Sequence, residues 1–161
     1  MNPKIREMTS SDIEAVQETA TASWHAVYEG IIPLDIQNRF LDLAYSTDMM
    51  HHKLTQSHMF AAEEDGRVIG FAEFTPPDAD GKTMLNAIYL HPDAQNKGIG
   101  TLLLEHGVEQ IEDMTTIYVE VEKENMIGRR FYDTKGFRMV KEYDDDFDGH
   151  ILKTVLMSRD I

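Results

Sequence analysis

The fold of this chain is decided by residues 89–101, which read Tyr-Leu-His-Pro-Asp-Ala-Gln-Asn-Lys-Gly-Ile-Gly-Thr. An apolar strand is predicted to end at Leu90, Pro92 turns the chain, and a loop with Gly98 and Gly100 opens a helix. The first backbone N–H groups of a helix have no partner within it, and the helix dipole adds partial positive charge there. Glycine also lets an anion approach the backbone closely. The stretch therefore predicts an anion site, most simply for phosphate.

Two familiar nucleotide loops do not fit these residues. A dinucleotide-binding loop requires a third glycine where Leu103 stands. A P-loop requires a lysine directly after its last glycine, whereas Lys97 precedes the glycines here. Taken alone, the loop is equally compatible with an ordinary strand-to-helix turn that contains two glycines.

Hydrophobic periodicity predicts helices packed around one sheet, a mixed α/β fold. Strands are expected at residues 5–8, 59–63, 68–74, 84–90, 116–121, 137–143 and 151–157, and helices at about 13–29, 35–45, 47–55, 99–114 and 125–135. An acidic loop around Asp144, Asp145 and Asp146 is expected to join the last two strands. No repeat or long linker interrupts the pattern, so a single domain over residues 1–161 is predicted.

The amino-acid composition excludes several classes of function. Fifteen Lys and Arg against 29 Asp and Glu leave a formal charge of −14. Binding to nucleic acid or to an anionic membrane surface is therefore not expected, because both depend on basic side chains. The absence of cysteine excludes disulfides and a thiol nucleophile on the enzyme. With no apolar segment long enough for a membrane span or a signal peptide, a cytoplasmic location is expected.

A second block of residues narrows the interpretation of the glycine loop. Asn125 follows a glutamate-rich strand end, Tyr132 comes seven residues later after a phenylalanine, and Gly136 and Phe137 close the block. Together with Gln95-x-x-Gly98-x-Gly100, this block resembles the GCN5-related N-acetyltransferase (GNAT) superfamily over nearly the whole chain. The resemblance implies a mostly antiparallel sheet of about seven strands with about four helices, and acetyl-CoA as the cosubstrate. Glycine at position 128, where the family usually has alanine, departs from the pattern.

The resemblance assigns residues to the cofactor. In the family, the strand before the loop bonds the pantetheine arm and the loop binds the pyrophosphate. The residues implied are Ile88, Tyr89, Leu90, Gln95, Asn96, Lys97, Gly98, Ile99, Gly100, Thr101 and Asn125, with Arg130 and Lys135 as basic neighbours.

The resemblance also implies the catalytic residues. Without a cysteine, direct attack of an amine on the thioester is the expected mechanism, which requires an acid and a base. Tyr132 is the acid by family position, and Glu120, twelve residues earlier, is the candidate base. Glu73 is the second candidate base and a candidate acceptor-binding residue, and water in place of a protein base is the third alternative. No metal is predicted, because His51, His52 and His58 offer no evident set of three ligands.

The acceptor is predicted from residues 24–33. Trp24 and Tyr28, followed by Gly-Ile-Ile-Pro, resemble a bacterial and archaeal subgroup that includes polyamine acetyltransferases of the PaiA type. Aromatic walls and carboxylates suit a cationic amine. An N-terminal peptide or protein acetyltransferase and a non-catalytic CoA-binding regulatory module remain as alternatives. A homodimer is also predicted by the resemblance.

Overall fold

The computed structural model describes residues 2–161 and places seven strands in one sheet in the order β1-β2-β3-β4-β5-β7-β6. Neighbouring strands are antiparallel except for the parallel pair β4 and β5. The strands are β1 (Lys4–Glu7), β2 (His58–Glu64), β3 (Arg67–Phe74), β4 (Lys82–Leu90), β5 (Thr116–Glu122), β6 (Arg138–Phe147) and β7 (His150–Asp160). This confirms the predicted mixed, mostly antiparallel sheet.

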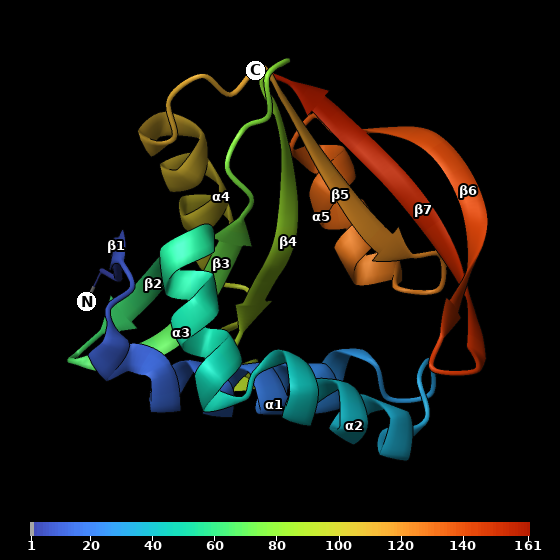
Figure 1. Ribbon diagram of the computed structural model, residues 1–161, viewed down its shortest axis with the longest axis horizontal. Coiled ribbons are helices and arrows are strands. Elements are labelled where there is room, and N and C mark those ends of the chain that lie inside the picture. Colours follow the sequence, from blue (N-terminus) through green and yellow to red (C-terminus); the bar gives the residue numbers. More distant parts are fainter. Residues whose placement is uncertain (1) are drawn as a thin grey trace.

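Helices cover both faces of the sheet (Figure 1). One face packs against α1 (Ile13–Val27), α2 (Leu34–Ala44) and α3 (Thr47–Gln56), and the other against α4 (Ile99–Gln110) and α5 (Met126–Thr134). Two short 3-10 turns, η1 (Ser10–Asp12) and η2 (Pro92–Ala94), precede α1 and α4. Each face of the sheet has its own apolar core, whereas the edge strand β6 is largely exposed. No helix within residues 2–161 has the length and apolar character that a membrane crossing requires.

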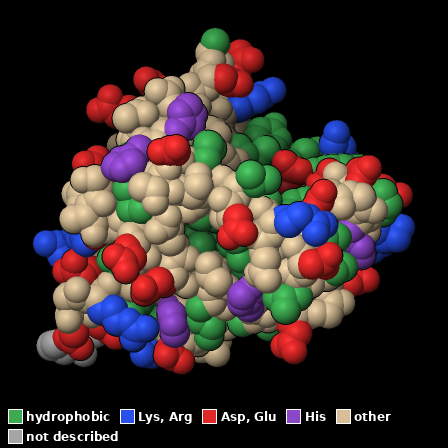
Figure 2. Space-filling model, turned by 60° about the horizontal axis from the view of Figure 1, so that its bottom comes forward, with side chains coloured by type: hydrophobic (Ala, Val, Ile, Leu, Met, Phe, Trp, Pro, Cys, Tyr) green, Lys and Arg blue, Asp and Glu red, His purple; other side chains and the backbone are tan. Residues whose placement is uncertain are grey.

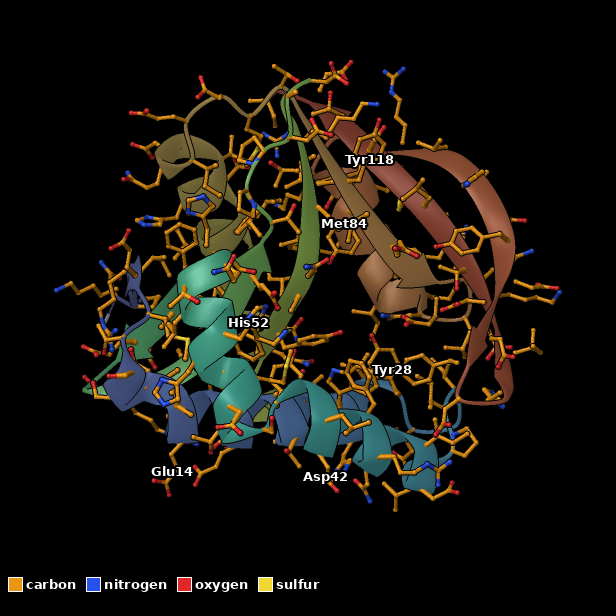
Figure 3. All side chains as sticks on the ribbon, in the orientation of Figure 1. Glu14, Tyr28, Asp42, His52, Met84 and Tyr118 are labelled. Atoms are coloured by element: carbon orange, nitrogen blue, oxygen red, sulfur yellow. The ribbon has the colours of Figure 1, made fainter. Side chains whose placement is uncertain are left out.

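The parallel pair β4 and β5 separates after a short contact. The two strands pair only at Lys82–Thr116, Thr83–Ile117 and Met84–Tyr118, and then diverge (Figures 1 and 3). β5 is nevertheless paired with β7 along its whole length. The sheet is therefore continuous on either side of an opening between the second half of β4 and the second half of β5.

The predicted acidic loop is wrong. Asp144, Asp145 and Asp146 lie within β6 and pair with β7, and the turn falls at Asp148 and Gly149, which have φ of 52° and 82°. Aspartate disfavours strands, but here the carboxylates of an exposed edge strand remain in water while the backbone pairs with β7. The long β6–β7 hairpin that results reaches the α1–α2 connection (Figure 1).

Three contacts fix this connection. The Arg39 Nε donates to Asp148 Oδ2 at 2.7 Å, and His150 Nε2 lies 3.2 Å from the Ile31 carbonyl oxygen. The buried Gln37 amide donates to the Ile32 carbonyl oxygen at 2.9 Å. The hairpin and the α1–α2 connection therefore border the opening between β4 and β5 on the side of α1.

Candidate active site

A cleft of about 400 Å³ occupies the opening between β4 and β5. It is lined by the second half of β4, the loop before α4, the middle of β5, the start of α5 and one side of α1. Of the residues predicted from the sequence, the lining contains Ile88, Tyr89, Leu90, Gln95, Asn96, Gly98, Ile99, Gly100, Thr101, Glu120, Asn125 and Tyr132. Sequence reasoning missed Ser23, Ala26 and Val27 of α1, whose apolar periodicity indicated only a packing face.

The loop before α4 has the geometry of an anion site. Asn96 and Gly98 adopt left-handed φ of 65° and 78°, and space is open where a Cβ on Gly98 would lie. The first turn of α4 carries no acidic residue that would occupy its free N–H groups. The buried Ile99 side chain anchors this turn in the core. The residues present therefore fit a phosphate-bearing group of the cosubstrate.

Asn125 caps the helix on the opposite wall. Its Oδ1 accepts a hydrogen bond from the Gly128 N–H at 3.0 Å, which begins α5. A Cβ on Gly128 would lie 2.6 Å from the Asn125 Nδ2, so glycine at this position accommodates the cap. This contact explains the departure from the family's usual alanine. Asn125 also lines the cleft.

Tyr132 lies in the cleft wall on α5. Phe131 and Phe137 pack edge-on against its ring, with centroids 5.2 and 5.3 Å away. Burial raises the pKa of the Tyr132 hydroxyl well above its ordinary value, and the nearby Tyr89 and Glu122 raise it further. The phenol is therefore protonated at physiological pH, as a proton donor must be before the reaction.

Glu120 and Glu122 of β5 point to the α1 side of the sheet, because the alternating residues Val119 and Val121 face the opposite core. Burial raises the pKa of Glu120, with Asp145 as the next cause. Burial also raises the pKa of Glu122, which is the more enclosed of the two. Glu122 was missed because the spacing to Tyr132 favoured Glu120. Strand alternation, which places both on one face, was the available signal.

The predicted aromatic residues Trp24 and Tyr28 lie behind the cleft wall. The Tyr28 hydroxyl is 3.1 Å from the hydroxyl of Tyr89 on β4; Tyr28 is labelled in Figure 3. The Trp24 ring stacks on Phe40 with centroids 4.4 Å apart, and its buried Nε1 has no hydrogen-bond partner among the described residues. The Trp24 and Tyr28 rings therefore pack behind the cleft wall on the α1 side.

Besides Trp24 and Tyr28, four further predicted residues are absent from the lining. Glu73 is buried under α3, where its carboxylate accepts from Lys53 Nζ at 2.9 Å and from Ser57 Oγ at 3.1 Å. The basic residues Lys97, Arg130 and Lys135 lie outside the cleft wall. Within residues 2–161, no three His, Asp or Glu side chains form a group that holds a metal ion.

A sheet that opens between two parallel strands, with an anion-binding helix start on one wall and a buried tyrosine on the other, defines an acyltransferase that uses a coenzyme A thioester. The family comparison agrees. The acetyltransferase (GNAT) family model matches residues 17–137, and the chain belongs to this family. It is an N-acetyltransferase with acetyl-CoA as cosubstrate.

Individual relatives extend the comparison. The chain is 28% identical over 155 residues to a spermidine N(1)-acetyltransferase of Thermoplasma acidophilum, covering 91% of this chain and 95% of that protein. A match to the bS18-alanine N-acetyltransferase of Escherichia coli, 32% identical, covers 48% of this chain and 53% of that protein. The PaiA N-acetyltransferase of Thermoplasma acidophilum, solved in complex with coenzyme A, superimposes with a TM-score of 0.86 at 24% identity, with all of both chains covered. That structure shows the same fold.

Proposed function

We propose that this enzyme acetylates a primary amine of a small cationic acceptor, with polyamines as the favoured class. The observation that carries the proposal is the acidic wall on the acceptor side. Asp145 of β6 raises the carboxyl pKa of Glu120 on β5, and Glu120 and Asp145 both raise that of Glu122. None of the three has a salt bridge among the described residues. Lys141 of β6 partly offsets the rise in the pKa of Glu120, but no cation within residues 2–161 acts on Glu122, so an external cation would supply the charge that this carboxylate lacks.

The surroundings support a cationic acceptor. The face that carries α1 and α2 comes forward in Figure 2, which shows acidic side chains spread over it with fewer basic ones between them. This distribution agrees with the net charge of −14 and attracts cations at long range. The named activity of the Thermoplasma acidophilum relative, spermidine N(1)-acetylation, belongs to the same class of acceptor.

We assign Tyr132 as the acid that protonates the departing thiolate, and a carboxylate of β5 as the base. Glu120 is the base that the sequence pattern favours, and it lines the cleft. Glu73 is less suited to either role, because Lys53 already neutralises it beneath α3. Thr101 and Gln95 beside the glycines, and the β4 backbone at residues 88–90, are proposed to hold the cosubstrate.

Turnover of an acceptor panel tests the function. Release of free CoA is followed with a thiol reagent, which sees no background because the chain contains no cysteine. Spermidine, spermine and putrescine are expected to be acetylated, and alanyl peptides are expected to be poor acceptors. Preference for alanyl peptides would support an N-terminal acetyltransferase instead. Binding of acetyl-CoA without turnover of any amine would contradict the proposal.

Replacement of Tyr132 by phenylalanine tests the acid. The Tyr132→Phe variant keeps the ring contacts and loses only the proton donor, so kcat is expected to fall by about 100-fold. Acetyl-CoA affinity, measured by calorimetry, is expected to stay within about twofold, since the family places this hydroxyl at the sulfur and not at the phosphates. An unchanged kcat would remove the assignment while leaving the family unaffected.

The predictions of a homodimer and of a cytoplasmic location remain predictions, as do the expected lack of nucleic-acid and membrane binding. Sedimentation of the purified protein tests the first directly. The non-catalytic module is disfavoured by membership in an acetyltransferase family.

A further inference from the structure

Glu122 occupies the part of β5 where the opening to β4 is wide. The β4–β5 ladder ends at Met84 and Tyr118, and continuing its register would place Glu122 opposite Ile88. The side chain of the next β4 residue, Tyr89, extends on the α1 side of the sheet, the same side as Glu122. Glu122 is not itself among the residues that line the cleft; it lies between the lining residues Val121 and Asn125, two residues beyond Glu120 on the α1 side of the same strand.

The groups around Glu122 come from four other elements. Tyr28 at the end of α1 faces the carboxylate, and its hydroxyl is 3.1 Å from that of Tyr89 on β4. Tyr132 on α5 is close enough for the charge of Glu122 to raise its pKa. Glu120 on β5 and Asp145 on β6 are the acidic neighbours that raise the pKa of Glu122. Glu122 is thus surrounded by hydroxyls and carboxylates.

No cation of the fold neutralises this carboxylate. Other enclosed acids of the chain are paired: Glu73 with Lys53 at 2.9 Å, and Asp12 with Arg6 at 2.7 Å. Within residues 2–161, Glu122 forms no salt bridge, although it is half-buried. A second buried polar atom without a hydrogen-bond partner among the described residues is Trp24 Nε1, and the Trp24 and Tyr89 ring centroids are 6.2 Å apart.

We propose that Glu122, rather than Glu120, is the base that removes the proton from the acceptor ammonium, with Tyr28 and Tyr89 as positioning residues. The inference rests on the proposed function. The ammonium gives one proton to the Glu122 carboxylate and becomes a neutral amine. Its nitrogen then bonds to the thioester carbonyl carbon, the C–S bond breaks, and the thiolate takes the phenolic proton of Tyr132. The second nitrogen proton returns to Tyr132, and Glu122 releases its proton to solvent.

The position of Glu122 couples the base to the acid. Burial raises the pKa of the Tyr132 hydroxyl most and Tyr89 next, and the charge of Glu122 adds to this rise. Uptake of the ammonium proton removes that charge, which lowers the pKa of Tyr132 when the thiolate needs a proton.

The pH dependence of spermidine acetylation tests the inference. Wild-type kcat, at saturating acetyl-CoA, is expected to fall on the acid side through the raised pKa of Glu122. In Glu122→Gln, kcat at neutral pH is expected to drop about 100-fold, and the acid limb is expected to disappear. Glu122→Asp restores part of the rate with its acid limb. In Tyr28→Phe, loss of the hydroxyl that favours the charged carboxylate shifts the acid limb to higher pH.

The exposed Glu109 on α4 provides the matched control, and Glu109→Gln is expected to keep the wild-type profile. Acetyl-CoA affinity, measured by calorimetry, confirms that each variant is folded. An acid limb that persists in Glu122→Gln and disappears in Glu120→Gln would overturn the inference and assign the base to Glu120. A wild-type enzyme that turns over none of the amines in the panel would instead overturn the proposed function, so the two failures are distinguishable.

Discussion

Glu73 and Glu122 are two enclosed carboxylates on the same face of the sheet, one on each side of β4. The fold neutralises Glu73 completely, with Lys53 at 2.9 Å and Ser57 at 3.1 Å. Glu122 faces the hydroxyls of Tyr28 and Tyr89 and further acids, and the described residues provide no cation for it. The two positions share residue type and sheet face, with Glu73 the more deeply buried, but they are opposite in electrostatics.

The difference separates a structural acid from a functional one. An enclosed charge that has its own counter-ion contributes to the integrity of the native state, and removing the partner is costly. An enclosed charge without a counter-ion destabilises the native state and persists where it serves a ligand or a reaction. The comparison therefore predicts that substitutions beside Glu73 act on stability, whereas substitutions on β5 act on catalysis.

The largest effect is expected on the Glu73 side. Lys53→Met keeps the apolar stem of the lysine and leaves the Glu73 carboxylate buried with Ser57 as its remaining partner. The free energy of unfolding, measured in urea, is expected to fall by about 3 kcal/mol. The double variant Lys53→Met with Glu73→Gln is expected to recover part of this loss. A decrease below about 1 kcal/mol in the single variant would contradict the structural role.

The opposite sign is expected on the β5 side. Glu122→Gln removes an unpaired, partly desolvated charge, so stability at neutral pH is expected to rise by about 1 kcal/mol. Because the folded-state pKa of Glu122 is raised, the folded protein retains a proton that the unfolded chain has already released. The destabilisation caused by the Glu122 charge is absent below the pKa of the unfolded chain and complete above the pKa of the folded protein. The stability that Glu122→Gln gains over wild type therefore disappears on acidification. A Glu122→Gln variant that is less stable than wild type at neutral pH would contradict this prediction.

Asp12 provides the control for that pH dependence. The hydrogen bond from Arg6 lowers its pKa, so its stabilising contribution is present above the unfolded pKa and is lost as pH falls through the folded pKa. Asp12→Asn is therefore expected to be less stable than wild type at neutral pH and to approach it in acid. Thermal unfolding of both variants across the same pH series shows opposite trends if the comparison holds.

The smallest effect is expected at the edge of the acidic wall. Glu120 is more exposed than Glu122, and its interaction with a cationic acceptor is screened by water and salt. In Glu120→Gln, KM for spermidine is expected to rise up to about fivefold while kcat stays near wild type. Added salt is expected to shrink the difference between the two proteins. A loss of kcat as large as that of Glu122→Gln would erase the distinction between the two glutamates.

Much of the fold was predictable from local patterns. The glycine loop, the strand before it and the helix after it follow from Pro92, Gly98 and the apolar period, and the structure confirms this strand–loop–helix unit. The acidic stretch of β6 was not predictable, because pairing with β7 overrides the weak strand propensity of aspartate. For the same reason, the sequence did not predict that Asp145 lies near Glu120 and Glu122.

The sequence by itself determined the anion-binding loop, the tyrosine that follows Asn125 by seven residues, and the absence of any cysteine for an acyl-enzyme. These are local features, whose chemistry is fixed by residue type and spacing. The tertiary structure decided which acid meets a cation, because Lys53 and Glu73 come from α3 and β3, whereas Tyr28 and Glu122 come from α1 and β5. Such pairing depends on long-range packing, and strand alternation alone places Glu120 and Glu122 on one face without distinguishing them.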